Sequence, residues 1–183
     1  RAEFLSRFLA PQVGNQIHEK GLMRTLHQRQ LEITVVCVDL RGFTAYSQVQ
    51  PPENVIGALR DYYNVVSEVV AQFGGTVKDV AGDGMLILVG APLPLADHAQ
   101  RGLDIAAAAR EAVLRALAAW NLNGSRLGVG VGAASGMVTA GVIDAAFRLE
   151  YAAIGPAVNL ASRLCSHAQN GEILISAQTV TLV

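Results

Sequence analysis

The chain has 183 residues, of which 51% are hydrophobic and 16% charged, so we expect one folded domain with a sizeable core and exclude a disordered tail. The formal net charge is −1, from 14 lysines and arginines against 15 aspartates and glutamates, and without a basic block nucleic acid is excluded as an expected partner. No apolar run reaches the roughly 18–20 residues that cross a bilayer, which predicts no membrane contact.

The first 30 residues mix apolar and charged residues, and Pro11 and two glycines interrupt any long helix. We expect a linker there and a domain over residues 31–183. The sequence begins with Arg1 rather than methionine, so we expect a longer parent polypeptide. Cys37 and Cys165 lie far apart in apolar stretches, which is typical of reduced thiols in a cytoplasmic protein.

The next segments predict a strand, a helix and a hairpin. Residues 32–39, EITVVCVD, are a run rich in β-branched residues that ends at an acid, as in a buried central strand. Residues 51–75 open with prolines, repeat apolar side chains at steps of four and three, and end in two glycines, which predicts an amphipathic helix. Strands at 76–80 and 85–89 follow, and Asp83 lies on the turn between them.

The second half predicts a helix, strands and a shorter helix. Residues 97–120 are rich in alanine and predict a helix. Residues 126–143 alternate glycine with β-branched residues, which predicts two strands joined at Ser135-Gly136 and a close approach of backbone or ligand. A short helix that stops at Asn170-Gly171 and a last strand, EILIS, complete the chain. The order predicts an α+β fold, a ferredoxin-like βαββαβ sheet with an appended strand and helix.

Two aspartates are candidate metal ligands. In a ferredoxin-like sheet the first strand lies beside the hairpin, so Asp39 and Asp83 are expected to point at one spot. Two carboxylates about 4 Å apart repel by roughly 1–4 kcal/mol, which a cation would relieve. Mg²⁺ binds one or two carboxylates together with substrate phosphates, and two such ions can activate an attacking and a leaving oxygen. The residue types alone leave open that each aspartate only caps a turn.

Other polar groups suit a triphosphate. The turn LRGFT, with Gly42, Phe43 and Thr44, can aim backbone N–H groups at an anion. Asn159 and Arg163 are four residues apart on one helix face, and Arg148 precedes an apolar strand.

The motifs VDLRGFT, AGDG, FRLEYAAIG and VNLASRL, in this order and spacing, resemble the catalytic domain of class III nucleotidyl cyclases, the adenylyl and guanylyl cyclases. The resemblance runs from about Leu31 to the C-terminus. It implies that Asp39 and Asp83 bind two divalent ions, Mg²⁺ or Mn²⁺, with the carbonyl of Leu40. It further implies that the ribose 3′-hydroxyl attacks the α-phosphorus and that pyrophosphate leaves.

The resemblance also implies roles for the other residues. Arg148 would contact the terminal phosphates, and Asn159 and Arg163 would orient the ribose and stabilise the transition state; taken alone, Asn159 could equally be a helix cap and Arg163 part of a solvated face.

The resemblance implies, in addition, a head-to-tail homodimer. Asp39, Asp83 and Arg148 would then face Asp79, Ala152, Asn159 and Arg163 of the partner subunit. The segment RFLAPQV resembles the linker that precedes such domains in bacterial receptors, which implies an upstream sensor domain.

The base would be read by Asp79 and Ala152. In the family, the position of Asp79 carries lysine in adenylyl and glutamate in guanylyl cyclases. A carboxylate only accepts hydrogen bonds, so beside adenine N1 it would cost about 1–3 kcal/mol, a tenfold to hundredfold preference for guanine. Ala152 offers adenine no acceptor and guanine no donor. A one-residue bulge would bring Lys78 into the pocket instead and favour ATP, and an exposed Lys-Asp pair on an edge strand is the remaining alternative.

We therefore expect a guanylyl cyclase that makes cGMP from GTP, with an adenylyl cyclase that makes cAMP from ATP as the second reading. The alternative from another class is a catalytically silent cyclase-like module that dimerises or senses nucleotide. The family's late phosphate-binding lysine has no counterpart before Val183, which favours that alternative unless the parent protein continues with the expected C-terminal hairpin.

Overall fold

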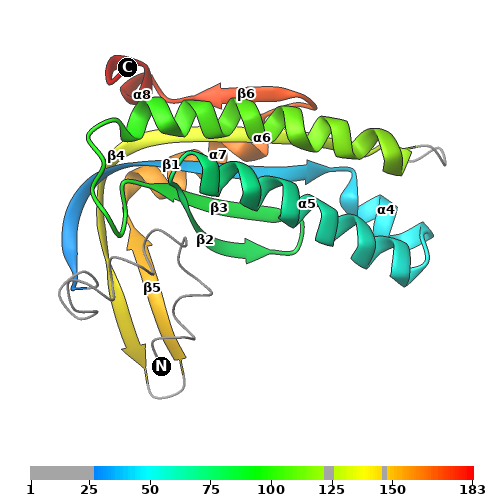
Figure 1. The fold of residues 1–183 in the computed structure, drawn as a ribbon, viewed down its shortest axis with the longest axis horizontal. Coiled ribbons are helices and arrows are strands. Elements are labelled where there is room, and N and C mark those ends of the chain that lie inside the picture. The colour runs from blue at the N-terminus through cyan, green and yellow to red at the C-terminus, as the bar shows by residue number, and fades with distance from the viewer. Residues whose placement is uncertain (1–26, 122–125, 146–147) are drawn as a thin grey trace.

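The computed structural model describes residues 27–121, 126–145 and 148–183 (Figure 1). The expected linker over residues 1–30 therefore lies outside the described residues, except for positions 27–30, and the first strand already begins at Arg29.

Six strands form one sheet with the order β2-β3-β1-β4-β5, and β6 pairs with β4. Neighbours along this path are antiparallel, whereas β6 runs parallel to β4. The strands are β1 (Arg29–Arg41), β2 (Thr76–Ala81), β3 (Gly84–Val89), β4 (Gly128–Ala145), β5 (Arg148–Ile154) and β6 (Glu172–Ile175). The central position of β1 explains its β-branched run, because a strand with neighbours on both edges and layers on both faces buries side chains on both faces, as β1 does from Ile33 to Val38.

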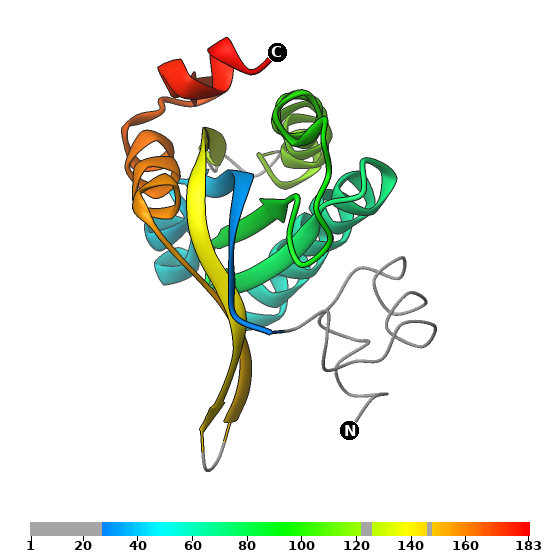
Figure 2. The same ribbon diagram turned by 90° about the vertical axis from the view of Figure 1, so that its left-hand side faces the viewer.

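Helices cover both faces of the sheet. They are α4 (Phe43–Val49), α5 (Pro52–Gln72), α6 (His98–Trp120), α7 (Pro156–His167) and α8 (Ala177–Thr181). Figure 2 shows α5 and α6 on one side of the sheet and α7 on the other. Val36 and Val38 of β1 join the core beneath α5 and α6, whereas Ile33 and Val35 join the core beneath α7.

The predicted ferredoxin-like core is confirmed, because β1, α5, β2, β3, α6 and β4 follow each other as strand, helix, strand, strand, helix, strand. The appended part consists of β5, α7, β6 and α8. Together, β5 and the end of β4 form an arm that projects from the body (Figures 1 and 2).

The prediction of two strands with a turn at Ser135-Gly136 is wrong. These residues lie inside β4, which runs unbroken for 18 residues, and Ser135 is opposite Thr34 of β1. The Ser135 hydroxyl is buried between the hydroxyls of Thr34, at 2.6 Å, and Thr179, at 2.9 Å. A serine whose hydrogen bonds are made inside the core can stay in a central strand, so it does not mark a turn here.

The glycine turn after β1 is present, but it leads into a helix that the sequence did not reveal. Gly42 has φ 76° and precedes α4. A Cβ atom at this position would come within 2.8 Å of the Arg126 carbonyl oxygen, so glycine is required both by the backbone angle and by the space. Within the described ranges, none of the helices combines the length and the apolar character needed to span a membrane.

Candidate active site

The two candidate metal-binding aspartates lie side by side. Asp39, near the end of β1, is opposite Gly84, the first residue of β3. Asp83 directly precedes Gly84, and its carbonyl accepts a hydrogen bond of 3.1 Å from the backbone N–H of Leu40. The hairpin turn that presents Asp83 needs a left-handed residue, and Gly82 provides it with φ 59°.

The electrostatics of this pair suit a cation. Burial and the neighbouring Asp83 carboxylate raise the pKa of Asp39, and Arg41 opposes that rise. Throughout the part of the chain that the structure describes, no group of three or more histidine, cysteine, aspartate or glutamate side chains could hold a metal ion. A hard divalent ion at this spot would therefore use the two carboxylates, a backbone carbonyl such as that of Leu40, and oxygens of a substrate, a donor set that fits Mg²⁺ or Mn²⁺.

Arg41 connects Asp39 to helix α7, a link that the sequence analysis missed. Its Nη1 forms an ion pair with Asp39 Oδ2, its Nη2 donates to the Cys165 carbonyl, and its Nε donates to the Ala168 carbonyl at 3.0 Å. The guanidinium lies over Gly130 of β4, where a Cβ atom would approach Nη2 to 2.2 Å. The sequence did contain one indication of this link, because side chains two residues apart in a strand, such as Asp39 and Arg41, lie on the same face.

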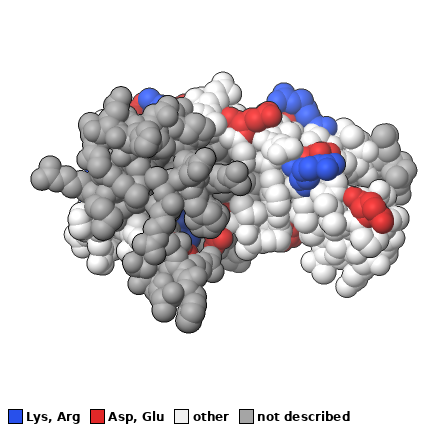
Figure 3. All heavy atoms as spheres, turned by 60° about the horizontal axis from the view of Figure 1, so that its bottom comes forward, with Lys and Arg blue, Asp and Glu red and all other residues white. Residues whose placement is uncertain are grey.

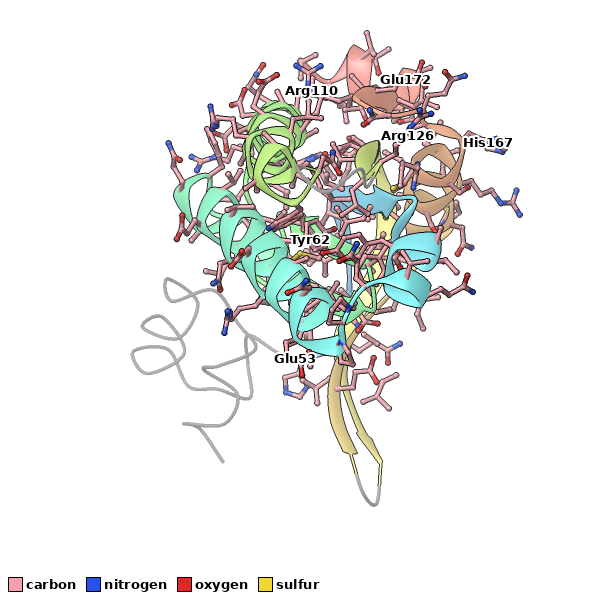
Figure 4. The ribbon with its side chains drawn as sticks, turned by 90° about the vertical axis from the view of Figure 1, so that its right-hand side faces the viewer. Glu53, Tyr62, Arg110, Arg126, His167 and Glu172 are labelled. Atoms are coloured by element: carbon pink, nitrogen blue, oxygen red, sulfur yellow. The ribbon has the colours of Figure 1, made fainter. Side chains whose placement is uncertain are left out.

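Two adjacent tyrosines of α5 hold the backbone beside each aspartate. The buried Tyr62 hydroxyl donates to the carbonyl of Val38 at 2.9 Å, and the Tyr63 hydroxyl donates to the carbonyl of Gly82. Each carbonyl belongs to the residue directly before an aspartate. Figure 4 shows Tyr62 between α5 and the sheet. Sequence periodicity marked Tyr62 only as a core position, because these hydrogen bonds depend on how the helix packs.

A groove of about 430 Å³ brings three of the predicted residues together, Asp39 of β1, Asp79 of β2 and Asn159 of α7. Its remaining lining residues are Cys37, Val38, Ala81, Gly84, Met85, Leu86, Val158, Ser162, Cys165 and Ser166. Asp79 is exposed at the rim, and its Oδ1 accepts a hydrogen bond of 2.9 Å from the backbone N–H of Val80.

A β-bulge decides which side chain of β2 faces this groove. The register shifts between Val77 and Asp79, so that Asp79 is opposite Leu86 and Lys78 is the extra residue. Leu86 and Asp79 both line the groove, and Lys78 is not among its lining residues. The bulge considered in the sequence is therefore present, but it does not bring Lys78 into the groove. Lys78 instead forms an ion pair of 2.9 Å with Glu150 of β5.

Two further predicted residues, Ala152 and Arg163, are not among the described residues that line this groove. Ala152 is half-buried on β5, opposite Gly141, and Arg163 is exposed one turn after Asn159 on α7. Arg148 opens β5, and its side chain lies outside what the structure describes.

The residues of the turn after β1 lie where that turn meets α4. Gly42 precedes α4, Phe43 packs against the core, and Thr44 is exposed in the first turn of the helix. Charged side chains of both signs are scattered over the described part of the face in Figure 3, which shows no broad basic surface there.

The chain is similar to known proteins over most of its length. A family model described as the adenylate and guanylate cyclase catalytic domain matches residues 25–183. The crystal structure of the guanylyl cyclase Cya2 is 33% identical with a TM-score of 0.79, covering 85% of this chain and 79% of that one. The adenylyl cyclase CyaB from P. aeruginosa is 32% identical with a TM-score of 0.81, covering 86% and 82%.

Curated relatives give the same picture. Adenylate cyclase 1 of Rhizobium meliloti is 33% identical over 138 residues, which are 73% of this chain and 20% of that protein. The chain spans about a quarter, 26%, of the length of the uncharacterized mycobacterial proteins that it matches.

Proposed function

The chain belongs to the adenylate and guanylate cyclase catalytic-domain family, the class III nucleotidyl cyclases, and we propose that within it this domain converts GTP to cGMP and pyrophosphate. The observation that carries the choice of GTP is the position of Asp79, an exposed hydrogen-bond acceptor, in the groove that Asn159 of the same subunit also lines.

The argument from Asp79 concerns hydrogen-bond donors and acceptors. Guanine presents its N1–H and 2-amino group as donors, whereas adenine presents N1 as an acceptor. An ionised aspartate only accepts, so it pairs with guanine and leaves adenine N1 facing a second acceptor. An unpaired polar group of this kind costs about 1–3 kcal/mol, or roughly tenfold to hundredfold in selectivity.

Each proposed residue has one task in the reaction. The bond from the ribose 3′-oxygen to the α-phosphorus forms while the bond from that phosphorus to the bridging oxygen breaks, and pyrophosphate leaves. We assign Asp39 and Asp83, with the Leu40 carbonyl, to two divalent ions. When bound, such ions supply Lewis acidity and lower the pKa of the attacking hydroxyl. Asn159 is assigned to the ribose, Arg163 to the charge of the transition state and Arg148 to the terminal phosphates.

The same proposal includes a homodimer. Ala152 and Arg163 do not line the groove of their own protomer, which supports a head-to-tail dimer in which Asp39, Asp83 and Arg148 of one subunit face Asp79, Ala152, Asn159 and Arg163 of the other. Large apolar side chains are exposed on three elements that carry assigned residues and on the neighbouring strand β4. They are Val80 on β2, Ile154 on β5, Leu160 on α7 and Met137 on β4. A partner subunit would cover them.

The cellular setting belongs to the proposal as well. Cys37 and Cys165 are free and buried, which suits a reducing cytoplasm. Regulation by an upstream sensor is proposed from the resemblance of the linker and from the greater length of the curated relatives.

The test is turnover of the purified protein with Mn²⁺ and either GTP or ATP, with cyclic nucleotide and pyrophosphate both measured. We expect at least tenfold higher kcat/KM for GTP. An equal or higher rate of cAMP formation would replace the proposal with an adenylyl cyclase, the activity named for two of the similar proteins, Adenylate cyclase 1 and CyaB. Absence of pyrophosphate release from this segment and from a longer one would leave the silent nucleotide-binding module.

A matched variant tests the base-reading role directly. Asp79→Lys combined with Ala152→Thr supplies a donor toward adenine N1 and an acceptor toward its 6-amino group. We expect cGMP synthesis to fall and cAMP synthesis to rise. Undiminished cGMP synthesis would show that Asp79 does not read the base.

A further inference from the structure

An ion pair joins the two edge strands at the ends of the path β2-β3-β1-β4-β5. Lys78 Nζ of β2 lies 2.9 Å from Glu150 Oε1 of β5. The lysine side chain is only 10% exposed and that of the glutamate 38%. A lysine this far from water needs an anionic partner, so the pair fixes where the ammonium lies.

Both members of this pair are close in sequence to the residues proposed to read the base. Lys78 directly precedes Asp79 at the bulge of β2. Glu150 is two residues before Ala152 in β5, and residues two apart in a strand lie on the same face. The ion pair therefore links the strand that carries Asp79 to the face of the strand that carries Ala152.

We propose that Glu150 is a specificity-determining positioning residue, because it holds the Lys78 ammonium away from the purine and leaves Asp79 to read the base. This inference rests on the proposed function. An ammonium is only a donor and an aspartate only an acceptor, so which of two consecutive side chains meets the base reverses the preferred purine. In a strand without the bulge, Lys78 rather than Asp79 would be opposite Leu86 and would face the groove.

Loss of the Glu150 charge would release the lysine. A desolvated ammonium without a counter-ion moves to the nearest accessible anion or to water. The neighbouring anionic side chain along β2 is Asp79, at the rim of the groove. Beside Asp79, the ammonium would neutralise the carboxylate that accepts hydrogen bonds from guanine, and it would offer a donor to adenine N1.

The experiment compares kcat/KM for GTP and for ATP in four proteins, all with Mn²⁺. Glu150→Gln, which keeps the shape of the side chain and removes its charge, is expected to lower the GTP/ATP ratio at least tenfold. Glu150→Gln combined with Lys78→Met has no lysine to release and is expected to stay within threefold of the wild-type ratio. Glu68→Gln, the same change at an exposed position of α5, is the control and is expected to leave the ratio unchanged.

The outcomes separate this inference from the proposed function. Wild-type protein that prefers ATP, or that turns over neither nucleotide, contradicts the proposed function before any variant is made. An active Glu150→Gln variant with the wild-type ratio overturns the inference alone, and so does a double variant whose ratio falls as far as that of the single one.

Should Glu150→Gln not fold, Glu150→Asp is the second variant, because it shortens the side chain by one methylene but keeps its charge. It is expected to lower the ratio by a smaller factor, and an unchanged ratio overturns the inference.

Discussion

Replacing Asp83 by asparagine is expected to stabilise the metal-free protein and to remove its response to divalent cations. Burial raises the pKa of Asp39, and the neighbouring charge of Asp83 raises it further, as expected for two carboxylates that repel each other in the folded state. For adjacent strands the separation is about 5–6 Å, and with an effective dielectric constant of about 40–80 the repulsion is roughly 0.7–1.7 kcal/mol. Solvent screening lowers this to about 0.5–1 kcal/mol, because the Asp39 side chain is 33% exposed.

The assay is thermal unfolding with and without millimolar Mn²⁺. For a domain of this size, about 1 kcal/mol corresponds to roughly 2–4 °C, so the metal-free variant should unfold about 1–4 °C above the wild type. Mn²⁺ should raise the Tm of the wild type, since a ligand that binds only the folded state stabilises it, and should leave Asp83→Asn unchanged.

Asp61→Asn is the control for this prediction. It makes the same chemical change at an exposed position of α5 and should keep the full Mn²⁺ response. A metal-free Asp83→Asn protein that unfolds more than about 2 °C below the wild type would refute the repulsion. A variant that keeps the wild-type response to Mn²⁺ would refute the assignment of Asp83 to the metal.

Two further predictions concern the surroundings of this site and the core. Arg41→Met removes the ion pair to Asp39 and the hydrogen bonds to α7, which should cost about 2–4 kcal/mol and lower the Tm by roughly 4–16 °C. A Tm equal to that of the exposed control Arg115→Met would contradict this. Burial lowers the pKa of His98 below 6.5, so the unfolded chain binds the proton more tightly and stability is lost as the pH falls from about 6.5 through the folded-state pKa. Urea unfolding between about pH 8 and pH 5 should show a smaller loss for His98→Gln, and identical losses would contradict the assignment.

Most strands and helices could be predicted from the sequence, because the spacing of apolar residues depends on the local secondary structure. The run of β-branched residues in β1 indicates a buried strand, and the helical repeat of apolar residues in α5 indicates a helix with one face on the core. Ser135 gave a false turn signal, because turn propensity depends on residue type alone, whereas the hydrogen bonds of Ser135 are made to Thr34 and Thr179, which are distant in sequence. The α4 helix followed Gly42 without a side-chain cap, so the usual start signal was missing.

Some of the contacts in the candidate site could be predicted from the sequence, and others could not. Asp39 and Asp83 could be paired in advance, because a strand end and a hairpin turn meet in this topology. Arg41, Tyr62 and Tyr63 could not be assigned, since each acts through a backbone carbonyl or side chain that only packing brings near. A bulge at Lys78 could be anticipated, but not the ion pair of this lysine with Glu150, which lies 72 positions later in the chain.

Helix α7 packs directly against β4, the strand that pairs with Asp39 of β1. At Gly132 of β4 a Cβ atom would come within 2.2 Å of the Cys165 backbone nitrogen and 2.3 Å of the Ala161 carbonyl oxygen, so helix and strand are in direct backbone contact. Together with the bonds of Arg41, this contact fixes Asp39 relative to the helix that carries Asn159.

The proposed base readers lie elsewhere, on two edge strands that a bulge and one ion pair hold in place. An edge strand has one hydrogen-bonded neighbour fewer than a central strand, so its side chains can be re-aimed at lower cost. We therefore expect Glu150→Gln, with Lys78 present, to shift the purine preference, while the response to Mn²⁺, which we assign to Asp39 and Asp83, stays as in the wild type. A Glu150→Gln protein that loses its Mn²⁺-induced rise in Tm would show instead that the edge strands and the Asp39–Asp83 pair are structurally coupled.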